Sequence, residues 1–123
     1  MHDGRYPAEM VGGMPVVVAP EEIDITNAPE LRSALLEAAA DGHGRLIADL
    51  TRTRFCDSSG LHALLAAHKH AQAEGGELLL VIPSTAVLRI FTITSIDRII
   101  PLHQPGRGPR ARRTQRIKRP PAT

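Results

Sequence analysis

The amino-acid sequence predicts an α/β domain built on a mainly parallel β-sheet. Short apolar runs of strand length alternate along the chain with longer segments whose apolar residues recur at helical spacing. This alternation is typical of parallel strands that are joined by crossover helices. The length of 123 residues suits one domain of ordinary size and leaves little room for a second core.

The N-terminal half is predicted to form a strand, a helix and a second strand. Residues 15–19 (PVVVA) and 46–50 (LIADL) are short apolar runs typical of buried strands. Between them a helix is expected to begin near Asn27, whose side chain can accept hydrogen bonds from first-turn amides, and to end at Gly42 and Gly44. The apolar positions of this helix that share one face are Leu31, Leu35, Ala38 and Ala39.

The C-terminal half continues the same alternation. A helix with apolar residues at positions 61, 64 and 65 is expected to end near residues 75–76. Residues 77–82 (ELLLVI) are predicted to form a strand, and because this run is strongly apolar, both of its faces are expected to be covered. A third helix is expected to open at residues 83–84, and residues 99–102 to form a last, short strand.

The two ends of the chain differ from the domain between them, which is predicted to span residues 14–103. Residues 1–13 are expected to be a flexible N-terminus or a short edge strand. Residues 104–123 hold seven of the 15 basic residues, four prolines and none of the 13 acids. Such a segment buries too little apolar surface to offset the entropy lost on ordering, so it is predicted to be a disordered basic tail.

The charge distribution argues against a nucleic-acid-binding fold. Residues 1–103 carry eight basic and 13 acidic side chains, a net charge of −5, so the overall pI of 9.2 reflects the tail. The tail is a solvated appendage or an electrostatic arm for nucleic acid or an anionic membrane, and no aromatic residue within it supports base stacking. No direct nucleic-acid binding is expected.

Other classes are excluded by length and composition. No apolar run approaches the roughly 18 residues of a membrane span, and the polar N-terminus is not expected to be a signal peptide. The single cysteine, Cys56, rules out an internal disulfide framework and a multi-cysteine zinc site. A cytoplasmic protein that does not bind a membrane is the simplest interpretation.

One motif, Asp57-Ser58-Ser59-Gly60, combines hydroxyl groups with a predicted helix start. Hydroxyls in this position can cap first-turn amides, and the partial positive charge of a helix N-terminus favours anions such as a phosphate on Ser58. Gly60 lacks a side chain, which would let a partner approach the backbone closely. Without further context, a helix cap alone is the more common explanation of such a motif.

No enzymatic or cofactor site is predicted. The histidines of the second helix are not spaced by four residues, so a helical metal pair is absent, and Ser58 does not lie in a nucleophile elbow. Gly42-x-Gly44 precedes a strand and not a helix, so no phosphate-binding loop is recognised. We therefore expect no catalytic residue, no metal and no cofactor.

In order and spacing, four segments resemble the STAS domain family: residues 15–31, 46–65, 75–83 and 87–94. The most specific is the Phe-x-Asp-Ser-Ser-Gly-Leu pattern at residues 55–61. Within the family the chain is most similar to bacterial anti-sigma factor antagonists. The resemblance implies a four- or five-stranded mixed, mainly parallel sheet with helices mostly on one face. It also implies a non-enzymatic binding protein.

The resemblance implies roles for individual residues. Ser58 corresponds to the serine that a cognate anti-sigma factor, itself a serine kinase, phosphorylates; a serine phosphatase reverses this step. The unphosphorylated form binds the anti-sigma factor and frees a sigma factor. Partner contacts are implied for Asp24, Asp57, Ser58, Ser59 and Gly60. For Asp24 and Asp57 a turn, and for Ser59 a helix cap, remain alternative interpretations.

Some positions depart from the family pattern, and several functions stay open. Glu21, preceded by Pro20, replaces a glycine, which predicts a differently shaped loop after the first strand. Cys56 replaces an aliphatic residue. Its thiol is expected to be buried and inert, or alternatively to be redox-sensitive. The alternative functions are a scaffold or subunit of a stressosome-like or lipid-transport complex, and a nucleotide-binding protein. A weak homodimer is a further alternative.

Overall fold

The computed structural model describes residues 6, 8–82 and 85–103. The predicted basic tail, residues 104–123, lies outside the described residues, as do residues 83–84, where the third helix was expected to open.

A five-stranded sheet with the order β1-β2-β4-β6-β7 forms the centre of the domain. Strand β1 is antiparallel to β2, and the other neighbours are parallel. A tight turn with φ of 61° at Gly12 and 84° at Gly13 joins β1 to β2, and only glycine adopts such angles without strain. The predicted α/β fold is confirmed. The strands are β1 (Ala8–Val11), β2 (Met14–Val18), β4 (Arg45–Asp49), β6 (Glu77–Val81) and β7 (Leu102–His103).

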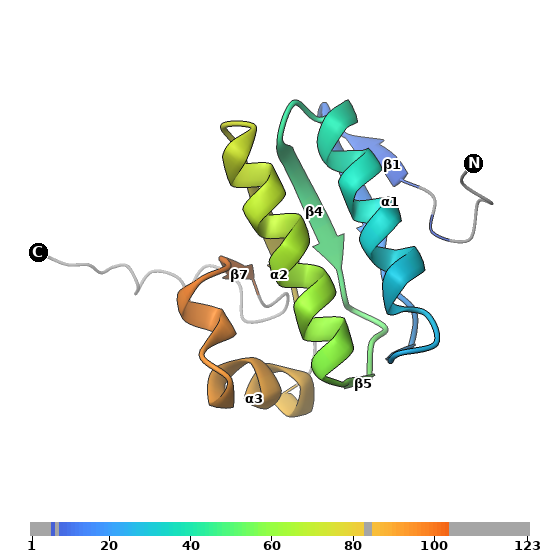
Figure 1. Cartoon of the computed structure of the whole chain (residues 1–123), viewed down its shortest axis with the longest axis vertical. Coiled ribbons are helices and arrows are strands. Elements are labelled where there is room, and N and C mark those ends of the chain that lie inside the picture. The colour runs from blue at the N-terminus through green and yellow to red at the C-terminus, as the bar shows by residue number, and fades with distance from the viewer. Residues whose placement is uncertain (1–5, 7, 83–84, 104–123) are drawn as a thin grey trace, which may run out of the picture.

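Helices α1 (Ala28–Asp41) and α2 (Ser58–Ala73) lie side by side on one face of the sheet (Figure 1). Each connects two neighbouring parallel strands, which is the crossover that the alternating sequence predicts. Helix α3 (Thr85–Ile93) and the 3₁₀ helix η1 (Ile96–Arg98) follow β6 and lie beside the lower end of α2 in Figure 1. Within the described residues, no helix is both long and apolar enough to cross a membrane.

The two faces of the sheet are buried to different extents. Leu78 and Leu80 of β6 are fully buried, whereas Leu79 and Val81 between them remain partly exposed. The same alternation holds in β2 and β4. The expectation that both faces of residues 77–82 are covered is therefore wrong. The apolar run alone did not reveal it, because α1 and α2 both pack on one side.

The last strand lies further along the chain than predicted. Residues 99–102 were expected to pair, but β7 is Leu102–His103. The amide of Ile100 donates to the carbonyl of Ile96 at 2.9 Å, which closes a turn and leaves both side chains buried. The apolar side chains of such a short run can be buried in a turn as well as in a strand.

The first helix begins at the predicted position through different hydrogen bonds. Asn27 occupies the cap position, but its side chain makes no capping bond to the first turn. Instead, its Oδ1 accepts from the amide of Asp24 at 3.0 Å, and its Nδ2 donates to the carbonyl of Glu22 at 2.8 Å. The side chain of Asn27 therefore ties the helix start to the preceding loop. The predicted inner face is buried as expected.

Residues on the two faces of β6 provide a direct test of this packing. Leu80→Ala should lower the free energy of unfolding by about 3 kcal/mol, because a fully buried leucine leaves a cavity. Leu79→Ala, the neighbouring leucine on the partly exposed face, should cost about 1 kcal/mol. Urea denaturation of both variants measures the difference, and equal losses would contradict the one-sided arrangement of the helices.

Candidate functional site at the start of helix α2

A second, two-stranded sheet holds the start of α2 against the loop that precedes α1. Strand β3 (Glu22–Ile23) pairs in parallel with β5 (Phe55–Cys56), and the amide of Asp57 donates to the carbonyl of Ile23 at 3.0 Å. This pairing brings the segment that contains Asp24 beside the Asp-Ser-Ser-Gly motif, although 33 positions separate Asp24 from Asp57. Strands of two residues have no periodicity, so sequence analysis did not find them.

The loop around Pro20 and Glu21 is held by the same region. The buried hydroxyl of Thr53 donates to the carbonyl of Pro20 at 2.8 Å. The amide of Arg54 donates to the carbonyl of Glu21 at 2.7 Å. The loop after β2 is thus fixed by hydrogen bonds from residues 53–54.

The side chain of Asp57 caps helix α2. Its Oδ1 accepts from the amides of Ser59 at 2.9 Å and Gly60 at 3.1 Å, and it also accepts from the Ser59 hydroxyl. The Ser59 hydroxyl, followed by the amides of Gly60, Ser59 and Ile25, lowers the pKa of Asp57. The cap is therefore a carboxylate, and not a serine hydroxyl as one interpretation of the motif predicted.

The two serine hydroxyls of the motif have different surroundings. Ser58, the first residue of α2, is exposed. Ser59 is partly buried, and its hydroxyl donates to Asp57. Of the two serines, Ser58 is therefore the more exposed to an enzyme in solution.

Asp24 shapes the neighbouring loop. Its carboxylate accepts from the amide of Thr26 at 2.9 Å and from the Thr26 hydroxyl. Its carbonyl accepts from the amides of Asn27 and Ala28. Asp24 thus forms a turn, as one of its two interpretations predicted. Its side chain remains partly exposed beside the motif.

The prediction that Gly60 lets a partner approach the backbone closely is wrong. Gly60 is buried, and a Cβ added there would lie 2.6 Å from the Sγ of Cys56 and 2.6 Å from Cγ2 of Ile23. The missing side chain therefore allows α2 to approach β3 and β5 from inside the domain. It does not open the backbone to a partner. The inward direction of this position depends on tertiary packing, which the motif alone does not show.

Cys56 is buried beneath the motif. Its thiol donates to the carbonyl of Asp57 at 3.7 Å. Burial, followed by the charge of Asp57, raises the pKa of this thiol to about 12. The thiolate is the reactive species, so this environment supports the inert interpretation of Cys56 over the redox-sensitive one.

Two apolar side chains beside the motif are exposed. Ile25 is 74% exposed on the loop after β3, and Phe55 is 47% exposed on β5. Large apolar side chains exposed on one part of a surface are typical of binding surfaces. Phe55 belongs to the pattern at residues 55–61, but the exposure of neither side chain was predicted. The polar residues on either side of Ile25 and before Phe55 are the signal that could have indicated it.

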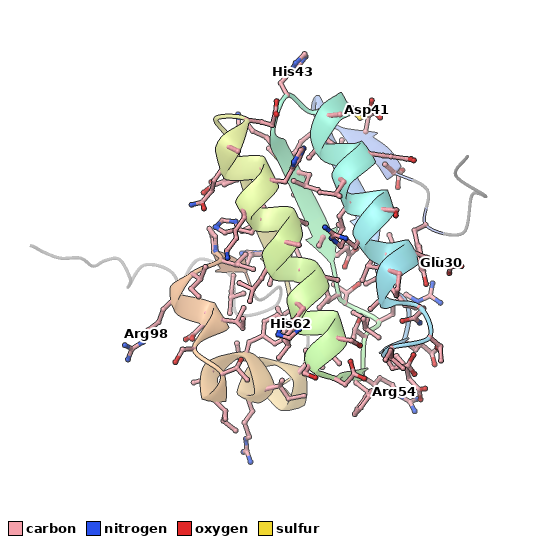
Figure 2. All side chains as sticks on the ribbon, in the orientation of Figure 1. Glu30, Asp41, His43, Arg54, His62 and Arg98 are labelled. Carbon is pink, nitrogen blue, oxygen red and sulfur yellow. The ribbon has the colours of Figure 1, made fainter. Side chains whose placement is uncertain are left out.

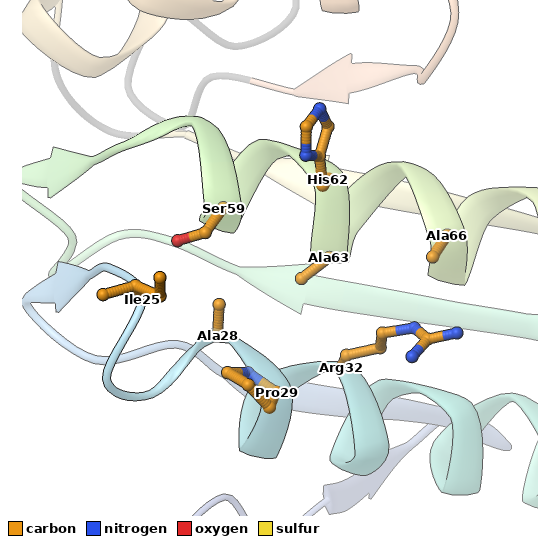
Figure 3. A pocket seen from close by; sticks show the side chains of 8 residues that line it. All are labelled: Ile25, Ala28, Pro29, Arg32, Ser59, His62, Ala63 and Ala66. Carbon is orange, nitrogen blue, oxygen red and sulfur yellow. The ribbon is translucent and has the colours of Figure 1, made fainter.

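A hollow between α1 and α2, here named the α1–α2 groove, adjoins the motif (Figure 3). Its volume is about 370 Å³. Figure 2 places His62 on the lower half of α2, on the same end of the domain as Glu30 and Arg54. The groove is lined by Ile25, Ala28, Pro29, Arg32, Ser59, His62, Ala63 and Ala66.

Metal-ligating side chains do not cluster in the part of the chain that the structure describes, where no three of His, Cys, Asp or Glu come together. His68 of α2 is buried, and its Nδ1 accepts from the amide of Leu78 at 3.4 Å. Burial lowers the pKa of His68, against smaller opposing effects of Glu77 and the backbone of Ile99. A neutral imidazole facing β6 serves packing in the core.

The sheet, the one-sided helices and the capped serine motif define the class of protein. The chain matches the STAS domain over residues 5–105 and belongs to the STAS domain family.

Several relatives carry more specific names. The chain is 33% identical to the anti-sigma-B factor antagonist of Bacillus subtilis, over 71% of this chain and 79% of that protein. It is 32% identical to an anti-sigma factor antagonist of Mycobacterium paratuberculosis, whose crystal structure aligns with a TM-score of 0.71 over 80% of this chain and 83% of that one. Unphosphorylated SpoIIAA aligns with a TM-score of 0.69 over 93% and 99% of the chains, at 22% identity, and shows the fold alone.

The Asp57 cap predicts a pH-dependent contribution to stability. Because the pKa of Asp57 is lowered in the folded state, its contribution is present above the ordinary aspartate pKa of about 4 and is lost as the pH falls through the lowered value. The difference in unfolding free energy between the wild type and Asp57→Asn should therefore shrink below about pH 4. Asp57→Ser, which like Asp57→Asn leaves a neutral acceptor in place of the carboxylate, is a second reference variant, and its difference from the wild type should shrink over the same pH range. A difference unchanged between pH 7 and pH 2.5 would contradict the carboxylate cap.

The buried thiol predicts slow alkylation. Folded protein at pH 8 should react with iodoacetamide at Cys56 at least about 100-fold more slowly than protein unfolded in urea, because a thiol with a pKa of about 12 is almost entirely protonated. Mass spectrometry of timed samples measures both rates. Equal rates would show that the thiol is accessible and ionised.

Proposed function

We propose that this protein is an anti-sigma factor antagonist whose binding is switched by phosphorylation of Ser58. The exposed hydroxyl of Ser58, at the start of a helix capped by Asp57, is the observation that carries the proposal. It is supported by the two relatives of 32% and 33% identity that are named anti-sigma factor antagonists. The partner is an anti-sigma factor that is also a serine kinase, and a serine phosphatase resets the switch. These partners act in the cytoplasm.

The geometry supports a binding surface centred on Ser58. Exposed Ile25 on the loop after β3 and exposed Phe55 on β5 can contribute apolar contact area to a partner that docks on Ser58. Asp24 and Asp57 shape the backbone around it through their own hydrogen bonds. The unmodified Ser58 side chain is uncharged, and the backbone on both sides of it is held by hydrogen bonds.

A phosphate would change this surface without unfolding the domain. It adds about −1.5 to −2 charges at neutral pH and lies at the N-terminus of a helix, where the macrodipole favours an anion. At an interface, however, the same dianion must lose its hydration. It also lies next to the Asp57 carboxylate, whose lowered pKa keeps it negative. Docking of the partner therefore fails while the fold persists.

Phosphate mapping tests this function. The purified protein is incubated with ATP and each GHKL-type serine kinase of its source organism, and the modified residue is located by mass spectrometry. We expect phosphate on Ser58, lost in Ser58→Ala and retained in Ser59→Ala and in Ser33→Ala, which removes an exposed serine of α1. In binding assays Ser58→Ala should keep the complex and Ser58→Asp should weaken it about tenfold or more. Undiminished labelling of Ser58→Ala, or no labelling by any kinase, would overturn the proposal.

A further inference from the structure

The α1–α2 groove has a floor made of small side chains. Ala28 of α1 and Ala63 of α2 are 4% and 3% exposed, and Ala66 continues the same line one turn further along α2. Methyl groups at these positions do not fill the space between the two helices, which leaves an open apolar hollow (Figure 3). A hollow of this kind accepts side chains from outside the domain.

The charge of the groove is opposite to that of the domain. Residues 1–103 carry a net charge of −5, yet none of the residues that line the groove is acidic. Exposed Arg32 lies along its α1 side, and exposed His62 stands at its α2 rim (Figure 3). The groove is therefore an apolar surface with a local cationic side on an otherwise acidic domain.

We infer that the α1–α2 groove binds an acidic amphipathic helix of the partner, with apolar side chains on the alanine floor and a carboxylate facing Arg32. A helix fits a trough between two parallel ridges and presents anchors at positions i, i+3 and i+4. Arg32 offers a forked donor that matches a carboxylate. Exposed Ile25 would contact the end of the bound partner helix that lies nearest to the motif.

This inference rests on the proposed function in one respect, because it takes the partner to be the protein that Ser58 switches. The groove begins at Ser59, which is adjacent to Ser58 in the sequence and hydrogen-bonded to Asp57. A phosphate on Ser58 would lie close to the end of an acidic helix bound there. Repulsion between the two negative groups then adds to the desolvation cost and explains why modification releases this partner.

Matched variants test the groove against an exposed surface elsewhere. Arg32→Glu and Ile25→Ser should each weaken binding of the kinase identified by phosphate mapping by about tenfold or more. Arg89→Glu and Ile93→Ser of α3 are the controls, since Ile93 is 73% exposed and Ile25 is 74% exposed. Calorimetry of the full chain measures the affinities. Equal losses in the groove and control variants, or none in either, would overturn the inference.

A second experiment does not need the kinase, so failure of the proposed function stays distinguishable from failure of this inference. The ¹⁵N-labelled full chain is titrated with a synthetic helical peptide that carries a leucine stripe flanked by glutamates, and with the same peptide carrying lysines instead. We expect the glutamate peptide to shift the amide signals of Ala28 and Ala63, and Arg32→Glu to abolish the shifts. Shifts outside the groove, equal shifts with both peptides, or none, would refute the groove's proposed ligand.

Discussion

The capped start of helix α2 is the constraint on which the rest of the site depends. One carboxylate oxygen of Asp57 accepts two first-turn amides and the Ser59 hydroxyl, while the backbone amide of Asp57 is bonded to Ile23. These bonds fix the start of α2 against the β3–β5 pair and hold the Ser59 hydroxyl on Asp57. Ser58 is the more exposed of the two serines.

Small residues let the two helices and the short sheet approach closely. Gly60 allows α2 to lie against Ile23 and Cys56, where an added Cβ would be 2.6 Å from each side chain. Alanines between α1 and α2 line the α1–α2 groove and leave it open at the surface. The same packing that buries the core thus also forms the hollow beside the motif.

Much of the fold follows from the sequence, because burial on one side imposes a periodicity that can be counted. The strands near residues 15–19, 46–50 and 77–82 and the two long helices were predicted in this way. The β3–β5 pair was not, because two residues have no period. The shift of the last strand to Leu102–His103 was also missed. The apolar composition of residues 99–102 is compatible with a turn as well as with a strand, so it does not distinguish the two.

The site was predicted less completely than the fold, for a related reason. The motif and a role for Asp24 in partner contact were expected, but the partners of polar side chains depend on tertiary neighbours. The side chain of Asn27 bonds back to Glu22 and Asp24 and not to its own helix, and Gly60 faces the core. The exposure of Ile25 was also missed, although its polar neighbours in the sequence were a signal for it.

The most direct test compares two forms of the same chain that differ only at one oxygen. Protein with phosphoserine incorporated at position 58 and unmodified protein are titrated with the anti-sigma factor by calorimetry, after circular dichroism has shown equal folding. The account predicts that the phosphorylated form binds about 100-fold more weakly, or not measurably, because a dianion cannot be buried in that interface. Equal affinities of the two folded forms would contradict it.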